Sequence, residues 1–206
     1  IETIGTLTEA GEFVGDTRPL HAAGSNQFVV KPVHGTCGGG VRKMFGLDLM
    51  DAIVSGAFYG KQEMMVQRCY EQHPFFEEIW PHSTNTMRVH GYVDPQTGFR
   101  AVAVVQKWGN PQSGFVDNFS KGGYTTWVSN GVMMNTYEDF TLLADRAGSA
   151  SSRAALYPGL KMPLSSHPNS DAKIAGLAIP FYREAIELVT EAANSISNEI
   201  YYAGWD

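Results

Sequence analysis

Short apolar stretches that alternate with turn-forming residues run through most of this chain, and they predict a protein built largely from β-strands. Residues 27–33 contain FVVKPV, which has the continuous apolar character of a buried strand interrupted by one lysine. Two antiparallel hairpins are predicted in the middle, because in each case a turn signal lies between two apolar runs. Their strands and turns are residues 84–93, 94–98 and 99–108 in the first hairpin, and 123–129, 130–131 and 132–136 in the second.

Two further segments have the pattern of an amphipathic helix. Residues 47–59 predict one helix, with Asp48 capping its start, and residues 179–196 predict a longer one with Pro180 near its first turn. Shorter signals predict a hairpin edge at 9–14, a strand at 63–70, an irregular region at 137–170 and a final strand in IYYAGWD. Strands dominate and do not alternate with helices, so the predicted fold class is α+β with antiparallel sheet.

Length, charge and composition limit the kinds of molecule that the chain is expected to bind. A chain of 206 residues can form one large domain or two small ones that share a cleft. Its net charge of −6, with both signs interspersed, argues against nucleic acid, which normally meets a basic patch. No run reaches the roughly 18 apolar residues of a membrane helix, and the start shows no signal-peptide pattern. The two cysteines, Cys37 and Cys69, predict reduced thiols in a cytoplasmic protein.

The stretch from Phe28 to Val41 carries the clearest chemistry. A strand delivers Lys31, and a loop with four glycines follows at once. A lysine in a buried strand is costly unless an anion meets it, and glycines let backbone amides approach a phosphate closely. The stretch is neither a Walker A loop nor a Rossmann fingerprint. The alternative interpretation is a hairpin turn with a solvent-facing lysine.

Two later stretches hold candidate anion and metal ligands. Arg88, at the end of STNTMR, has a guanidinium suited to a phosphate or carboxylate, although an exposed strand arginine is the plainer interpretation. In VDNFSKGG, the oxygens of Asp117 and Asn118 suit Mg²⁺ and Lys121 suits a phosphoryl group. That stretch also reads as an ordinary polar turn. No histidine spacing suits zinc, and no GxSxG elbow indicates a serine hydrolase.

The order of these stretches resembles one known family, the sugar-transfer-associated ATP-grasp domain, which is related to α-L-glutamate ligase-like proteins. The resemblance rests on Lys31 with its glycine loop, then MMVQRCYEQHP, NTMR, DNFSKGG, HP before IP, and GWD. It implies an α+β ATP-grasp fold in which two subdomains with largely antiparallel sheets enclose a nucleotide cleft. Residues 1–66 would form the phosphate-loop subdomain, and residues 67–206 would form the second one.

The resemblance also implies roles for individual residues, with ATP and Mg²⁺ as cofactors. Lys31 would contact the nucleotide phosphates, and Arg88 would steady the γ-phosphate or an acyl phosphate. Asn118 and Lys121 would face the reacting phosphate, and Asp206 would be the first Mg²⁺ carboxylate. The loop closing over the phosphates would comprise Gly35, Gly38, Gly39, Gly40 and Val41. Adenine would be received by Gln67, Arg68, Cys69 and Tyr70, with Val30 and Val66 as apolar walls.

Members of the family continue past GWD to a Glu-x-Asn pair that bridges Mg²⁺, so the domain in this chain is expected to be C-terminally incomplete. The implied activity is ATP-dependent ligation of a carboxylate to an amine or related nucleophile through an acyl phosphate. A saccharide-linked carboxylate is the expected substrate, as part of polysaccharide or cell-surface biosynthesis. Two alternatives are an ATP-dependent phosphotransferase on the same fold and a nucleotide-binding module without catalysis.

Overall fold

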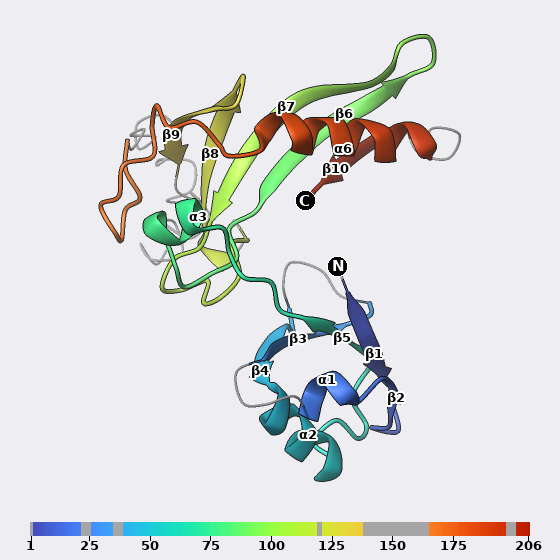
Figure 1. Ribbon diagram of the computed structural model, residues 1–206. Helices are drawn as coiled ribbons and strands as arrows, with labels where there is room; N and C mark the ends of the chain where they lie inside the picture. The colour runs from blue at the N-terminus through green and yellow to red at the C-terminus, as the bar shows by residue number, and fades with distance from the viewer. Residues whose placement is uncertain (1, 22–25, 35–38, 119–120, 138–164, 197–200) are drawn as a thin grey trace, which may run out of the picture. The chain divides into compact units, whose positions relative to one another are not determined.

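A computed structural model describes the chain except for residues 1, 22–25, 35–38, 119–120, 138–164 and 197–200. The chain divides into two compact units, residues 1–71 and 72–206. Each unit has its own five-stranded antiparallel sheet and its own core, and each is described by itself (Figure 1). Among the described residues, no helix is long and apolar enough to cross a membrane.

Unit 1 is built on a sheet of strand order β2-β1-β5-β3-β4. Its elements are β1 (Thr3–Leu7), β2 (Phe13–Gly15), α1 (Arg18–His21), β3 (Gln27–Pro32), β4 (Arg42–Phe45), α2 (Gly46–Val54) and β5 (Met64–Arg68). All of its strand pairs are antiparallel.

One face of this sheet forms the core of unit 1. Side chains alternate between the two faces of a strand, and along β3 every second residue is buried, beginning at Phe28. Phe28, Val30 and Val66 are fully buried and cluster with Leu20 of α1 and Leu49 of α2. The two helices therefore cover this face, and the intervening residues of β3, Lys31 among them, belong to the other face.

Unit 2 has a sheet of strand order β10-β6-β7-β8-β9. Its elements are α3 (Pro74–Ile79), β6 (Met87–Asp94), β7 (Gly98–Trp108), β8 (Tyr124–Ser129), β9 (Val132–Tyr137), α6 (Tyr182–Ser195) and β10 (Tyr202–Trp205). The last strand of the chain, β10, lies at the edge of the sheet and pairs with β6.

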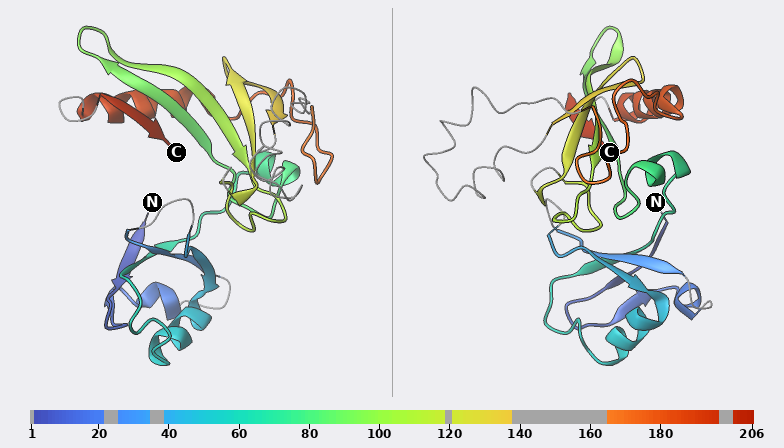
Figure 2. Two further views of the ribbon diagram at one scale, coloured as in Figure 1. Left: turned by 180° about the vertical axis from the view of Figure 1, so that it is seen from behind. Right: turned by 90° about the vertical axis from the view of Figure 1, so that its left-hand side faces the viewer.

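Helix α6 covers one face of this second sheet, as both views in Figure 2 show. Val89 and Val104 pack there with Ala193 of the helix. Ile79 of α3 packs against Trp108 in a neighbouring cluster that continues the same core. Val89 and Val104 are paired across β6 and β7 and therefore point to the same face of the sheet. The residues that alternate with them along these strands lie on the opposite face.

Several predicted elements are confirmed, with shifted ends. The helix predicted at 47–59 begins at Gly46 and ends at Val54, and its N-cap residue Phe45 makes no side-chain cap. The prediction that Asp48 caps this helix is therefore wrong, because Asp48 already lies inside the first turn. The helix predicted at 179–196 is α6, and the irregular region predicted at 137–170 lies mostly outside the described residues.

The division of the chain falls later than the predicted boundary between residues 66 and 67. That boundary would cut β5, whose residues up to Arg68 pair with β3. Since β5 lies between β1 and β3, the whole strand belongs to unit 1, and the contacts separate after residue 71.

Candidate functional site

The face of the unit 1 sheet opposite its helices carries Lys31. Strand register places Lys31 beside Met65 of β5, and it places the preceding pair, Val29 and Gln67, on the same face. Val29 is also opposite Lys43 of β4, so a second cation lies along the same face. Lys31 is half-buried, and no described carboxylate forms an ion pair with it. A half-buried cation without such a partner suits an anionic ligand.

Part of the predicted glycine loop is described. Gly35 and Gly38 lie outside the described residues, whereas Gly39, Gly40 and Val41 follow them into β4. Gly40 has a φ of +75°, which L side chains rarely adopt, and an added Cβ would lie 3.0 Å from the Pro32 ring. The backbone conformation and the nearby Pro32 ring at this position therefore favour glycine.

The segment predicted to receive adenine is the end of β5 and the residues that follow. Gln67 is 8% exposed, and its side-chain amide donates to Thr3 Oγ1 at 3.0 Å. Arg68 pairs with Glu2 at 2.8 Å, and the Cys69 N–H donates to the Gln27 carbonyl at 2.9 Å. Tyr70, the fourth residue of the segment, is 55% exposed.

The two valines that would form the apolar walls of an adenine site are not on a surface. Val30 and Val66 are both fully buried in the core under the helices of unit 1, so that implied role is wrong. Apolar side chains that do share the face of Lys31 include Val29 and Met65, and both are half-buried.

In unit 2, the face opposite α6 brings Arg88 and Asp206 together. Trp205 pairs with Val89, so the next residue, Asp206, lies beside Arg88 across β10 and β6. Arg88 Nε donates to Asp206 Oδ1 at 2.8 Å, and Arg88 Nη2 donates to Asp206 Oδ2. The arrangement is a bidentate pair, which fixes the orientation of the carboxylate.

A lysine that the sequence analysis did not single out completes this group. Lys107, near the end of β7, is only 7% exposed, and its Nζ lies 2.8 Å from Asp206 Oδ1 and 3.6 Å from Asp117 Oδ1. Its backbone N–H donates to the Thr86 carbonyl at 2.8 Å, which extends the pairing of β6 and β7 to this point. We call Arg88, Lys107, Asp117 and Asp206 the four-charge cluster.

Asp117 is held in the loop between β7 and β8. Its Oδ2 accepts from the Thr86 N–H at 2.7 Å and from Thr86 Oγ1 at 2.6 Å, and the residue is 6% exposed. Gly123 allows the loop to pack this closely, because an added Cβ would lie 2.5 Å from the Asp117 carbonyl oxygen and 2.7 Å from that of Trp108. Thus the loop fixes Asp117 over the start of β6.

The ion pairs shift proton affinities in the four-charge cluster. The hydrogen bonds with Asp206 raise the pKa of Arg88, although desolvation acts in the other direction. Burial alone would raise the pKa of Asp206, but hydrogen bonds from Arg88 and Lys107 outweigh it and hold that pKa below its usual value. Both residues are therefore charged near neutral pH.

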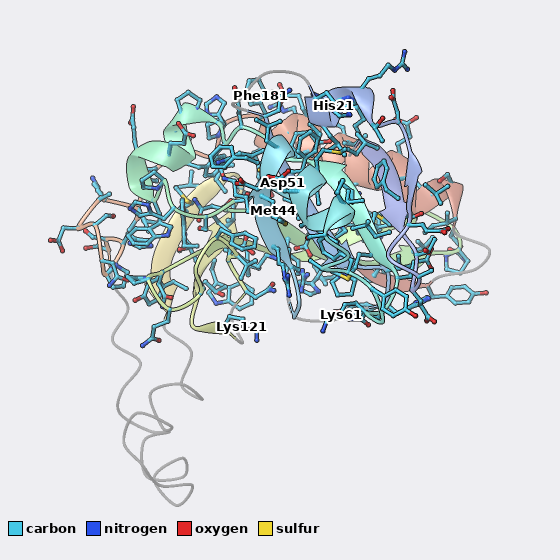
Figure 3. All side chains as sticks on the ribbon, turned by 90° about the horizontal axis from the view of Figure 1, so that it is seen from below. His21, Met44, Asp51, Lys61, Lys121 and Phe181 are labelled. Atoms are coloured by element: carbon cyan, nitrogen blue, oxygen red, sulfur yellow. The ribbon has the colours of Figure 1, made fainter. Side chains whose placement is uncertain are left out.

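The remaining predicted residues of this loop contribute less to the described geometry. Asn118 is half-buried, and its carbonyl accepts from the N–H groups of Lys121 and Gly123 at 2.9 and 3.1 Å. Lys121, labelled in Figure 3, is exposed and makes no ion pair with a described residue. It is free to meet an anionic ligand from solvent.

The three residues of the tail GWD, Gly204, Trp205 and Asp206, have different structural roles. Trp205 packs into the core on the α6 side, which turns Asp206 to the opposite face. A Cβ on Gly204 would lie 3.2 Å from the imidazole of His90 and 3.7 Å from Arg88 Cδ. A glycine therefore leaves room for the residues that lie beside the carboxylate.

The residues present can bind a magnesium ion only if phosphate oxygens and waters complete its coordination. Mg²⁺ at nucleotide sites is commonly held by one or two carboxylates together with phosphate oxygens and waters. Within the described ranges, no group of three or more His, Cys, Asp and Glu residues could hold a metal. Asp117 is buried and engaged, whereas the Asp206 side chain is 39% exposed. Asp206 is thus the one member of the four-charge cluster suited to such an ion.

Comparison with known proteins gives one finding. A family model described as "Sugar-transfer associated ATP-grasp" matches residues 50–206, which is most of the chain. No curated protein and no solved structure matches the chain.

Proposed function

Since the chain belongs to the sugar-transfer associated ATP-grasp family, we propose that it is the core of an ATP-dependent ligase that joins a carboxylate to an amine or related nucleophile. Its two units, each with an antiparallel sheet and few helices, have the α+β architecture predicted for the family. The observation that carries the proposal is the pair of cations, Arg88 and buried Lys107, fixed on the sheet face opposite α6.

The proposed reaction has two steps. An oxygen of the substrate carboxylate attacks the γ-phosphorus of ATP, the bond to the bridging oxygen breaks, and ADP leaves. The nucleophile then attacks the acyl carbon, and inorganic phosphate leaves with the electrons of the broken bond. Catalysis depends mainly on neutralising the negative charge of the transferring phosphoryl group. Fixed cations in a site shielded from water do this best.

Lys107 and Arg88 have the properties that this task needs. Lys107 is held between two carboxylates in a largely buried position, so its ammonium group needs little reorganisation to meet a phosphate. The planar guanidinium of Arg88 can hold two oxygens of a phosphate or an acyl phosphate at once. Asn118 and Lys121 would face the same phosphate, and a magnesium ion held by Asp206 would add further charge neutralisation.

Unit 1 carries the other residues that we propose to bind nucleotide. Lys31 would contact the phosphates, and the backbone of the glycine loop, residues 35–41, would close over them. The segment from Gln67 to Tyr70 would receive adenine, with Val29 and Met65 providing apolar contact on the face of Lys31.

The substrate would be a carboxylate on a saccharide, in the synthesis of a polysaccharide or cell-surface component. The sugar-transfer association of the family supports this choice. We place the reaction in the cytoplasm, where ATP is supplied.

A trapping experiment tests the activity. The protein is incubated with Mg-ATP, hydroxylamine and a panel of uronic acids, because hydroxylamine converts an acyl phosphate into a stable hydroxamate. We expect hydroxamate that depends on ATP and on one of the acids, and we expect Lys107→Met to abolish it. ADP formed with a saccharide but without hydroxamate would instead indicate phosphotransfer to a hydroxyl. Bound ATP without turnover on any acid would indicate a non-catalytic module.

A further inference from the structure

Asp206 uses the same donors that a nucleotide phosphate would need. Arg88 directs two N–H groups at its carboxylate, and Lys107 Nζ lies 2.8 Å from Oδ1. The strongest candidate phosphate donors of unit 2 are therefore occupied by a carboxylate of the protein itself.

The four-charge cluster as a whole is close to neutral. It contains two cations, Arg88 and Lys107, and two carboxylates, Asp117 and Asp206, within one connected set of ion pairs. A divalent cation that approaches Asp206 without a nucleotide comes close to two positive side chains, Arg88 and Lys107, which flank this carboxylate. Bare Mg²⁺ is therefore repelled by the same residues that hold Asp206 in place.

Of the two carboxylates, Asp206 is the one that can move. Asp117 is 6% exposed, and its oxygens are engaged by the N–H and the hydroxyl of Thr86 and by Lys107. The Asp206 side chain is 39% exposed, and the side chains of Arg88 and Lys107 hold it. An incoming anion can replace Asp206 on the two cations without disturbing Asp117.

We propose that Asp206 is an exchangeable counter-ion: nucleotide phosphate displaces it from Arg88 and Lys107, and the released carboxylate then becomes a ligand of Mg²⁺. The inference rests on the proposed binding of ATP. Metal binding at Asp206 thus depends on nucleotide, and Asp206 opposes nucleotide binding until a metal is present. Because coupling is reciprocal, the metal and the nucleotide raise each other's affinity by the same factor.

The proposed displacement of Asp206 predicts that a substitution of this residue changes the affinity for ATP differently with and without metal. Asp206→Asn keeps the shape of the side chain but removes the charge that competes for Arg88 and Lys107. We expect its affinity for ATP in EDTA to exceed that of the wild type by roughly fivefold or more, the lower range of coupling between sites. We expect addition of Mg²⁺ to strengthen ATP binding in the wild type but to have little effect in the variant.

Asp171→Asn is the matched control. It removes one negative charge from the same unit, at an exposed residue whose φ of +59° asparagine tolerates. Its affinity for ATP with and without Mg²⁺ should equal that of the wild type. An equal gain in both variants would attribute the effect to net charge and overturn the proposal.

The experiment is calorimetric titration of the wild type, Asp206→Asn and Asp171→Asn with ATP, in EDTA and in Mg²⁺, together with titration of the wild type with Mn²⁺ alone. We expect no binding of Mn²⁺ alone at millimolar concentration, and this titration does not depend on the folding of a variant. Tight Mn²⁺ binding without nucleotide, or unchanged or weaker ATP binding by Asp206→Asn in EDTA, overturns the exchange. Failure of the wild type to bind ATP under any condition would overturn the proposed function instead.

Discussion

Arg88 and Asp206 lie side by side on paired antiparallel strands, and Arg88 Nε donates to Asp206 Oδ1 at 2.8 Å. The pair joins a motif in the first half of the chain to the last residue of the sequence. It depends on β10 pairing with β6, because that register alone brings the carboxylate to the arginine. The strand pairing and the candidate site are therefore coupled.

The first prediction concerns the docking of β10. Arg88→Lys keeps a positive charge but loses the bidentate geometry, so the attachment of Asp206 should weaken. Because both side chains are more than a third exposed, we expect a loss of about 1 kcal/mol or less. Hydrogen exchange of the β10 amides measures it directly. Arg100→Lys, an exposed arginine on β7 in the same unit, should leave that exchange unchanged.

The second prediction concerns the buried lysine. Lys107→Met leaves Asp117 buried without its cation, and we expect unit 2 to lose roughly 2 kcal/mol of stability, the usual cost of an unsatisfied buried polar partner. Asp117→Asn in the same chain should recover part of the loss, since the unpaired charge is then gone. Denaturant unfolding of both single variants and the double variant gives the coupling energy. Strict additivity would contradict a direct interaction between the two residues.

The third prediction concerns the loop that holds Asp117. Gly123→Ala forces a Cβ against two backbone carbonyls, at 2.5 and 2.7 Å, so the loop must shift. We expect a loss of about 1–3 kcal/mol and faster exchange of the Thr86 amide, which donates to Asp117. Gly114→Asn in the same loop meets open space at a φ of +66° that asparagine tolerates, and it should have little effect.

The fourth prediction concerns pH. His167 is fully buried, stacks on Trp80 at a ring separation of 4.8 Å, and its Nε2 lies 3.0 Å from the Gly109 carbonyl oxygen. Burial lowers the pKa of His167, although the hydrogen bond to Gly109 partly offsets it. The folded state therefore favours the neutral ring more than the unfolded state does.

This lowered pKa gives the pH dependence a definite sign. The stabilisation is fully present above about pH 6.5, the pKa of an unfolded histidine, and is lost as pH falls from there through the lower folded pKa. We expect the free energy of unfolding to fall between pH 7.5 and pH 5, and we expect His167→Phe to flatten this dependence. An unchanged slope in the variant would exclude His167 as the cause.

Much of the fold could be predicted because its signals are local. The hairpin of β8 and β9 followed from Asn130-Gly131, and both residues have the positive φ that such a turn requires, 51° and 81°. The α+β class and the family resemblance are confirmed as well. Strand β4 was not predicted, because its sequence RKMF carries two charges on a short edge strand.

The site was harder to predict because its contacts are not local. The cost of burying a lysine drew attention to Lys31, which is half-buried, whereas the lysine that is nearly fully buried is Lys107. Nothing beside Lys107 in the sequence marks it, since its carboxylate partners come from a later loop and from the end of the chain. The same reasoning about burial, applied to every strand lysine, would have found it.

The most direct test of nucleotide binding compares two lysines of unit 1. Lys31 lies on the sheet face opposite the helices, and Lys61, labelled in Figure 3, is an exposed lysine of the segment that leads into β5. Thermal unfolding with saturating Mg-ATP should show a raised Tm for the wild type and for Lys61→Met, because a ligand that binds only the folded state stabilises it. Lys31→Met should lose most of that rise. No rise in the wild type, or an equal loss in both variants, would contradict the binding of ATP on the Lys31 face.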